Sequence, residues 1–144
     1  MTSKPVQVLF ICKGNMLRSP VAEAVFNDQA PKGWHATSAG TVPGIAPWEP
    51  EGWAIKDIPE MQEALAALTT ISPNLSEHRT RRLTPEMVAQ ADLVISMAED
   101  TNSPAFLLES PKVTHWNIPN TLEGALLIKD RVLALIKTLE PHSH

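Results

Sequence analysis

The chain has 144 residues, enough for one domain, because most domains contain roughly 100–150 residues. Hydrophobic residues make up 43% and charged residues 19%, so the chain can bury a core, and wholesale disorder is not expected. The formal net charge of −4 argues against a general nucleic-acid-binding protein and against a basic membrane-surface protein. No apolar run reaches the ~20 residues of a membrane span, and residues 6–11 are too short for the apolar region of a signal peptide. We therefore expect one cytoplasmic domain over residues 1–144, with neither a nucleic-acid nor a membrane partner.

The first predicted elements are a strand, a helix and a second strand. Residues 6–11 are apolar and rich in β-branched side chains, which is typical of a short buried parallel strand. A turn-forming stretch follows at residues 12–15. A helix is predicted to begin at Ser19, a favoured N-cap residue followed by proline, and to end at Gln29. Residues 35–39 form a second short strand in this interpretation.

The rest of the chain alternates between helices and strands, after a loop at residues 41–57 that is rich in Pro, Gly and Trp. Thr84 is the predicted cap of the middle helix. This alternation favours an α/β domain with a mainly parallel sheet. The predicted helices cover residues 59–68, 84–91 and 122–139, and the predicted strands cover residues 92–97 and, more weakly, 113–118.

The only cysteine, Cys12, lies where a functional site is expected. It follows the first strand and precedes a helix, and ligands of open α/β sheets bind beyond the carboxyl ends of strands. Such a position favours the thiolate form of a cysteine. Arg18 comes six residues later, so the intervening loop can curl around a tetrahedral oxyanion, with backbone N–H groups pointing inward and the guanidinium binding two oxygens. A single cysteine also excludes an intramolecular disulfide and a metal site built from several thiolates, so we expect no metal and no cofactor.

Other residues of this loop have types that suit the same chemistry. Gly14 and Asn15 both tolerate a positive φ angle, and Ser19 can donate a hydrogen bond to the sulfur and stabilise the thiolate as a leaving group. The chemistry that needs this set is phosphoryl transfer to sulfur and then to water. The competing interpretation is a buried structural cysteine before an ordinary strand–helix turn.

Residues 8–23, VLFICKGNMLRSPVAE, resemble the signature of the low-molecular-weight protein tyrosine phosphatases. Three further stretches resemble that family in the same order along the chain, so the likeness extends over most of it. They are residues 38–41 (SAGT), 75–81 (LSEHRTR) and 92–97 (DLVISM).

The resemblance implies a four-stranded parallel sheet flanked by helices and gives roles to particular residues. Cys12 would be the nucleophile and Arg18 the phosphate-binding cation, with Asn15, Ser19 and His78 tying the loop together by hydrogen bonds. The implied substrates are phosphate monoesters, including phosphotyrosine and other phosphoprotein sites, and the implied ligands are oxyanions such as phosphate, sulfate, vanadate or arsenate. The implied phosphate-binding loop consists of Lys13, Gly14, Asn15, Met16, Leu17 and Arg18.

The main departure from the family pattern concerns the general acid. In the family this is an aspartate followed by proline, after the last strand. The corresponding stretch here is residues 116–121, which places Asn120 at the acid's position. An amide cannot give a proton to a leaving group, so we expect slow turnover, since general acid catalysis contributes about 10²–10⁴-fold. Glu123 is the alternative acid if the loop bends inward.

Two further departures bear on the substrate. Leu17 stands where the family usually has a second cysteine, so Cys12 cannot be protected by an internal disulfide, and an arsenate reductase that relays electrons through its own cysteines is excluded. The chain has no tyrosine, whereas the family has tyrosines near its acid, which puts phosphotyrosine specificity in question. The family also has an aromatic or apolar wall to its pocket, for which Trp48 and Trp53 are both candidates.

Three hypotheses follow from these residues. The leading one is a slow phosphatase-type hydrolase of aryl phosphates or phosphotyrosine that forms a phosphocysteine at Cys12. The second is an arsenate reductase that uses an external thiol. The third is a non-catalytic protein that binds phosphate or phosphoproteins.

Overall fold

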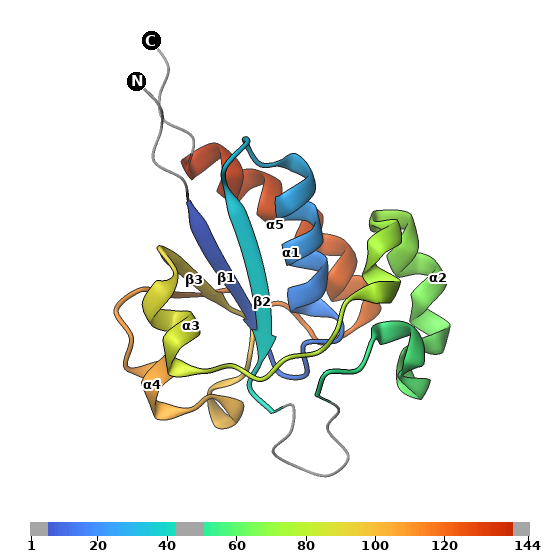
Figure 1. The fold of residues 1–144 in the computed structure, drawn as a ribbon, viewed down its shortest axis with the longest axis horizontal. Coiled ribbons are helices and arrows are strands. Elements are labelled where there is room, and N and C mark those ends of the chain that lie inside the picture. The colour runs from blue at the N-terminus through green and yellow to red at the C-terminus, as the bar shows by residue number, and fades with distance from the viewer. Residues whose placement is uncertain (1–5, 43–50, 140–144) are drawn as a thin grey trace.

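A parallel sheet forms the centre of the computed structural model, which describes residues 6–42 and 51–139 (Figure 1). Its order is β2-β1-β3-β4, and every neighbouring pair is parallel. The predicted α/β class with a four-stranded parallel sheet is confirmed. The strands are β1 (Gln7–Cys12), β2 (His35–Gly40), β3 (Leu93–Ser96) and β4 (Val113–His115).

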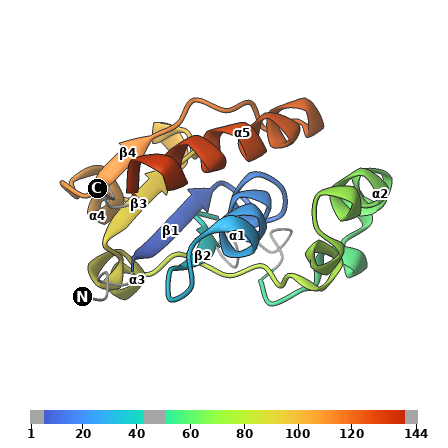
Figure 2. The same ribbon diagram turned by 90° about the horizontal axis from the view of Figure 1, so that it is seen from above.

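Helices cover both faces of the sheet (Figures 1 and 2). Helices α1 and α5 pack against each other on one face, and α3 and α4 lie on the opposite face. None of the helices in the described part of the chain is long and apolar enough to cross a membrane. The helices are α1 (Arg18–Gln29), α2 (Gln62–Ile71), α3 (Pro85–Gln90), α4 (Ala105–Leu108) and α5 (Leu122–Leu139), with short 3₁₀ turns η1 (Ile55–Asp57), η2 (Pro59–Met61), η3 (Pro73–Glu77) and η4 (Asp100–Asn102).

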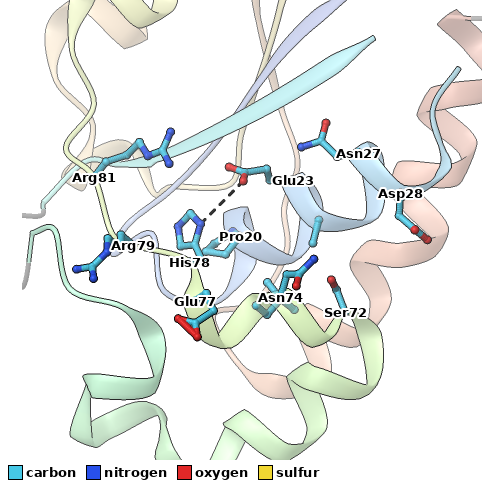
Figure 3. Close-up of a pocket in the computed structure, with 12 residues that line it drawn as sticks. Pro20, Glu23, Asn27, Asp28, Ser72, Asn74, Glu77, His78, Arg79 and Arg81 are labelled. Carbon is cyan, nitrogen blue, oxygen red and sulfur yellow. Dashed lines mark ion pairs between the residues drawn. The ribbon is translucent and has the colours of Figure 1, made fainter. Parts of the chain in front are cut away.

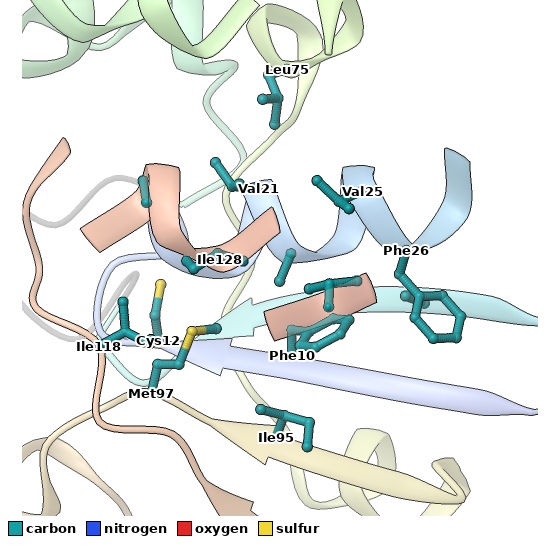
Figure 4. Packing of buried hydrophobic residues seen from close by; sticks show 14 of the residues in the cluster. Phe10, Cys12, Val21, Val25, Phe26, Leu75, Ile95, Met97, Ile118 and Ile128 are labelled. Carbon is teal, nitrogen blue, oxygen red and sulfur yellow. The ribbon is translucent and has the colours of Figure 1, made fainter. Parts of the chain in front are cut away.

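Strand β1 is buried on both sides because its alternate side chains enter two different apolar clusters. Phe10 and Cys12 face α1 and α5, in the larger cluster drawn in Figure 4, whereas Leu9 and Ile11 face α3 and α4. Each large apolar side chain buried in this way contributes roughly 1.5–3 kcal/mol to the free energy of folding. The alternation therefore fixes the direction in which Cys12, the last residue of β1, leaves the sheet.

The strand order places the expected site at one edge of the sheet. The chain moves from β1 outward to β2, and then returns to add β3 on the other side of β1, so the connections reverse between β1 and β3. Ligands of open α/β sheets bind at this reversal, beyond the carboxyl ends of the strands. Cys12 ends β1 there, and Met97 follows β3 and donates its backbone N–H to the Ile11 carbonyl at 2.7 Å.

Most element boundaries agree with the sequence predictions, and the differences have local causes. Thr84 caps α3, as predicted, by accepting a hydrogen bond from the Met87 backbone N–H. Strand β4 ends at His115, earlier than predicted, because Trp116 and Ile118 turn into the core. The short turns η3 and η4 and helix α4 have too little periodicity to be predicted. Residues 43–50 of the predicted loop lie outside the described residues.

Candidate active site

Cys12 and Ser19 lie at the two ends of the loop between β1 and α1. The Cys12 side chain is buried, and its Sγ lies 3.0 Å from Ser19 Oγ and 3.4 Å from the Ser19 backbone nitrogen. Ser19 Oγ accepts a hydrogen bond from Asn15 Nδ2 and lies 3.5 Å from the Ala39 carbonyl oxygen, and it donates its own proton to the sulfur when Cys12 is a thiolate, which only accepts. Two N–H or O–H donors on Sγ stabilise a thiolate and a departing sulfur.

Ser19 is therefore not the helix cap that the sequence analysis predicted. Helix α1 begins at Arg18, and Leu17 occupies the N-cap position without a side-chain hydrogen bond. The hydroxyl of Ser19 serves the sulfur instead of the helix N-terminus.

Asn15 holds the loop in its curled conformation. Its φ angle is +56°, and it is the only non-glycine residue with positive φ in the described part of the chain. The expectation of a positive φ at Gly14 is wrong, since the turn is made at Asn15 alone. Asn15 Nδ2 donates to Ser19 Oγ at 2.9 Å and to Ser38 Oγ at 3.0 Å, while Oδ1 accepts from the Arg81 backbone N–H at 2.9 Å. These bonds to a fully buried amide offset the cost of the left-handed backbone.

Arg18 is completely buried, and only one side of its guanidinium is paired. Nη1 donates to the carbonyls of Met97 at 2.5 Å and Ile118 at 2.9 Å, and it lies 3.3 Å from the Glu99 carboxylate. Nε and Nη2 have no hydrogen-bond partner among the described residues. A buried donor without a partner costs about 1–3 kcal/mol, so an anion that accepts from both nitrogens relieves a penalty that the fold otherwise carries. Nε and Nη2 form the edge of a guanidinium that binds oxyanions in a bidentate manner.

A small pocket of about 210 Å³ opens above the sulfur. Its walls are apolar except for the thiol, the backbone and one amide, so the described residues around it provide neither a carboxylate nor an imidazole. The described residues that line this pocket are Cys12, Gly14, Met16, Leu17, Met61 and Asn120.

Asn120 reaches this pocket because the segment before α5 packs closely against that helix. A Cβ atom on Gly124 would lie 2.1 Å from the Pro119 carbonyl oxygen, so only glycine permits this approach. Thr121 Oγ1 accepts the Gly124 backbone N–H at 3.0 Å and closes the first turn of the helix. Glu123 is exposed in that turn and is not among the residues around the pocket, so the structure does not favour it as the substitute acid.

Two tryptophans, Trp48 and Trp53, are the candidates that the sequence offers for the wall of this pocket. Trp53 is 52% exposed and is not part of the pocket wall, so the expectation is wrong for this residue. Trp48 lies outside the described residues. Met61, from η2, contributes the wall instead, although its stretch of sequence predicts only part of an ordinary helix.

His78 supports Asn15 from behind the loop in its neutral form. Burial and the positive charge of Arg81 lower the pKa of His78 to about 4. A neutral ring has one N–H, and His78 Nε2 lies 3.0 Å from Asn15 Oδ1, an oxygen that only accepts. The proton is therefore assigned to Nε2, which leaves Nδ1 as an acceptor.

This pKa predicts a loss of stability on mild acidification. The unfolded chain takes up a proton on His78 near pH 6.5 and the folded chain near pH 4, so the free energy of unfolding falls as the pH drops through this interval. The difference corresponds to roughly 3 kcal/mol. His78→Gln keeps an N–H donor but does not titrate, so its unfolding free energy, measured by urea denaturation, should fall less than that of the wild type between pH 6.5 and 4. His115→Gln, at an exposed histidine, is the control, and equal slopes for all three proteins would contradict the burial of a neutral His78.

Further contributors to the site were not predicted. Glu99 and the Met97 carbonyl hold Arg18, and Glu23 accepts a hydrogen bond from Ser38 Oγ at 2.7 Å behind Asn15. Glu99 follows β3 at the reversal of the strand connections, and because the sequence predicts a parallel sheet but not the order of its strands, it gives no signal for this contact. Lys13 belongs to the loop but contributes no side-chain hydrogen bond there among the described residues.

The family model for low molecular weight phosphotyrosine protein phosphatase matches residues 7–115. The chain belongs to this family. The matched region contains the whole loop from Cys12 to Ser19 as well as Asn15's partners, but it ends before Asn120.

The proteins similar to this chain include both arsenate reductases and tyrosine phosphatases. An arsenate reductase from Staphylococcus aureus (strain N315) is 27% identical over 111 residues, which cover 76% of this chain and 73% of that protein. A probable low molecular weight protein-tyrosine-phosphatase, EpsP, from Ralstonia nicotianae is 31% identical over 90 residues, which cover 62% of this chain and 54% of that protein. Among solved structures, a low molecular weight protein tyrosine phosphatase from T. tengcongensis superposes with a TM-score of 0.65 at 29% identity, covering 93% of this chain and 97% of that one.

Proposed function

We propose that this protein is a phosphatase-type hydrolase of aryl phosphate monoesters, including phosphotyrosine, that works slowly through a phosphocysteine at Cys12. The observation that carries the proposal is the buried Arg18, whose Nε and Nη2 lack a partner within residues 6–42 and 51–139 while Nη1 is fixed by two carbonyls. A cation held in this way beside a cysteine whose sulfur accepts hydrogen bonds suits an oxyanion that reacts at sulfur.

The proposed reaction has two steps. Cys12 Sγ attacks phosphorus, the S–P bond forms, and the bond from phosphorus to the ester oxygen breaks. Arg18 and the backbone N–H groups of the loop bind the equatorial oxygens on which negative charge is distributed. Water then attacks the phosphocysteine, the S–P bond breaks, and phosphate leaves while Ser19 stabilises the departing thiolate.

The residues around the pocket explain why turnover would be slow. Asn120 has no proton to give to the ester oxygen, so the leaving group departs as an anion. Nor can an amide accept a proton from the attacking water in the second step. The enzyme would therefore favour leaving groups of low pKa, such as nitrophenolate.

Stopped-flow kinetics on p-nitrophenyl phosphate test the proposal directly. The wild type should release nitrophenolate, with a burst if hydrolysis of the phosphocysteine is the slower step, and Cys12→Ser should abolish both burst and turnover while still binding vanadate. The matched control is Ser103→Ala, which removes a hydroxyl elsewhere. Signals of the same size from the wild type and Cys12→Ser would contradict the phosphocysteine route, and vanadate binding without any turnover would favour the non-catalytic binding protein.

A second candidate is an arsenate reductase that depends on an external thiol. The pocket favours it in one respect: arsenate loses hydroxide or water to the attacking sulfur, so no ester leaving group has to be protonated. Cys12 would form a thiol–arsenate adduct, and an external thiol would then attack that sulfur, which gives a mixed disulfide and arsenite. Arsenic gains the two electrons that the two thiols lose. The curated arsenate reductases among its relatives support this candidate.

An arsenite assay with glutathione or a thioredoxin system separates the two candidates. Arsenite formation that requires both Cys12 and the thiol would support the reductase. A flat signal with every thiol donor, together with turnover of the aryl ester dependent on Cys12, would leave the phosphatase as the sole activity.

A further inference from the structure

Glu99 brings a carboxylate to one side of the Arg18 guanidinium, away from the edge that is free for an oxyanion. One of its oxygens lies 3.3 Å from Arg18 Nη1, and within residues 6–42 and 51–139 this is the only ion pair that Arg18 makes. The Glu99 side chain is 53% exposed, whereas that of Arg18 is fully buried. The buried cation of the proposed site therefore shares its charge with a carboxylate that water also reaches.

The contact with Glu99 adds negative charge to this arrangement more than direction. A guanidinium Nη1 carries two hydrogens, and the carbonyls of Met97 and Ile118, at 2.5 Å and 2.9 Å, accept both. The 3.3 Å separation from Glu99 exceeds the roughly 2.7–2.9 Å of a well-formed charge-assisted N–H···O hydrogen bond. Removing the charge of Glu99 should therefore leave the guanidinium pointing in the same direction.

The backbone places Glu99 beside Arg18, and the carboxyl group is ionised at neutral pH. The turn η4 follows directly, and the Glu99 carbonyl accepts a hydrogen bond from the Asn102 backbone N–H at 2.9 Å. Burial raises the pKa of Glu99, but the hydrogen bonds from its own backbone N–H and from Arg18, together with the charges of Arg18 and Lys13, outweigh this effect and lower the pKa. The carboxylate is thus negatively charged under the conditions of the proposed reaction.

Other carboxylates near the loop do not have this position. Glu23 and Glu77 line a pocket of about 600 Å³ behind the loop, between α1 and the segment around η3 (Figure 3). Glu23 lies 3.9 Å from His78 Nδ1, along the dashed line in Figure 3, and Glu77 pairs with Lys56 at 3.0 Å. In the described part of the chain neither is paired with the buried cation, so a single carboxylate offsets its charge.

A cation shared in this way binds an oxyanion less tightly than a cation without a partner. A phosphate held by Nε and Nη2 and the carboxylate beside Nη1 lie on different sides of one small planar group, so their negative charges repel each other. Because Glu99 is partly exposed, water and salt screen this repulsion, and the expected effect on affinity is severalfold. An unpaired buried guanidinium without this carboxylate would retain the phosphate product more strongly.

We propose that Glu99 weakens oxyanion binding at Arg18 and thereby limits inhibition by the phosphate product. This inference rests on the proposed oxyanion site, because it concerns how tightly that site binds. Glu99 acts through Arg18 without touching the reacting atoms, so it is not a catalytic residue. Substrate and product carry similar charge on their phosphate groups, so the binding of both should change together when Glu99 is altered.

Titration of inorganic phosphate by calorimetry, with the wild type and Glu99→Gln, tests the proposal. Glutamine has almost the same shape as glutamate, and its oxygen can still face Nη1, so the substitution removes the charge and little else. We expect the variant to bind phosphate about threefold more tightly or better, and this difference to shrink when the salt concentration is raised to about 0.5 M. In kinetics on p-nitrophenyl phosphate, the inhibition constant of phosphate and KM should fall together, while kcat should not rise.

The matched control is Asp100→Asn, which makes the same change of charge one residue later. Asp100 is exposed and borders the same pocket of about 740 Å³ as Glu99, but within the described residues it makes no ion pair with Arg18. Its substitution should change phosphate affinity much less than that of Glu99. Equal gains in the two variants would show a general effect of net charge and overturn the role assigned to Glu99.

The sign of the effect separates this role from a purely structural one. If Glu99 served to direct the guanidinium, Glu99→Gln would bind phosphate more weakly than the wild type, and that result would overturn the proposal. Equal affinity of the two proteins for phosphate would also overturn it, while the oxyanion site itself would stand. A wild-type protein that binds no phosphate at all would overturn the proposed site, and this inference with it.

Discussion

Replacing Arg18 with lysine should lower kcat/KM for p-nitrophenyl phosphate by about 10²–10³-fold, the loss that follows removal of one fixed donor to a developing anion. The substitution preserves the positive charge, so the effect would come from geometry. A lysine ammonium is a flexible point charge, whereas the guanidinium directs Nε and Nη2 in parallel at one oxyanion. Its Nη1 is simultaneously fixed by the Met97 and Ile118 carbonyls, which a single ammonium cannot reproduce.

The measurement is a comparison of steady-state kinetics and phosphate affinity for the wild type, Arg18→Lys and the exposed control Arg82→Lys. Thermal unfolding of each protein separates a loss of function from a loss of fold, because Arg18→Lys also removes hydrogen bonds to two buried carbonyls. We expect both kcat and phosphate affinity to fall for Arg18→Lys and neither to change for Arg82→Lys. A folded Arg18→Lys protein with the activity of the wild type would show that the unpaired guanidinium edge does not bind the reacting group.

The parts of the fold that the sequence predicts well are those governed by local pattern. The apolar run of β1 and the periodicity of α5 each specify an element without help from the rest of the chain, and the structure has both within a residue of the prediction. The spacing from Cys12 to Arg18 is also a local feature, and it predicts a loop that can curl around a single oxyanion. These features depend on neighbours in sequence, so the sequence alone reveals them.

The features that were missed depend on residues far apart in the chain. Ser19 is a good N-cap by local rules, but Asn15 and Cys12 use its hydroxyl in the folded protein. Glu99 meets Arg18 only because β3 is placed next to β1, and no local pattern records this contact. The wall of the pocket also depends on a distant part of the chain, since Met61 reaches it from a segment whose own sequence predicts only a helix. Contacts between residues far apart in the chain therefore decide the roles of Ser19, Glu99 and Met61, which local propensity does not predict.

Asn120→Asp should raise kcat for phosphotyrosine and other esters with poor leaving groups by about 10²–10⁴-fold, the usual contribution of a general acid. The structure makes this test informative because Asn120 already borders the pocket that contains Cys12, and the change replaces an amide with a carboxyl group of almost the same shape. For p-nitrophenyl phosphate the gain should be much smaller, since nitrophenolate leaves readily without a proton. The rate of the variant should also fall at high pH, where the new carboxyl group is ionised and cannot donate.

The matched control is Asn117→Asp, which makes the same change three residues earlier at an exposed position that borders a different pocket, beside Glu99 and His115. A gain with Asn120→Asp that depends on the leaving group, and no gain with Asn117→Asp, would show that the loop is poised for acid catalysis and lacks only the acid. Identical rates for both variants on every ester would mean that position 120 does not approach the leaving group during the reaction. In that case the absent proton donor could not explain slow turnover, and a reaction without an ester leaving group, such as arsenate reduction, would become the better account of this pocket.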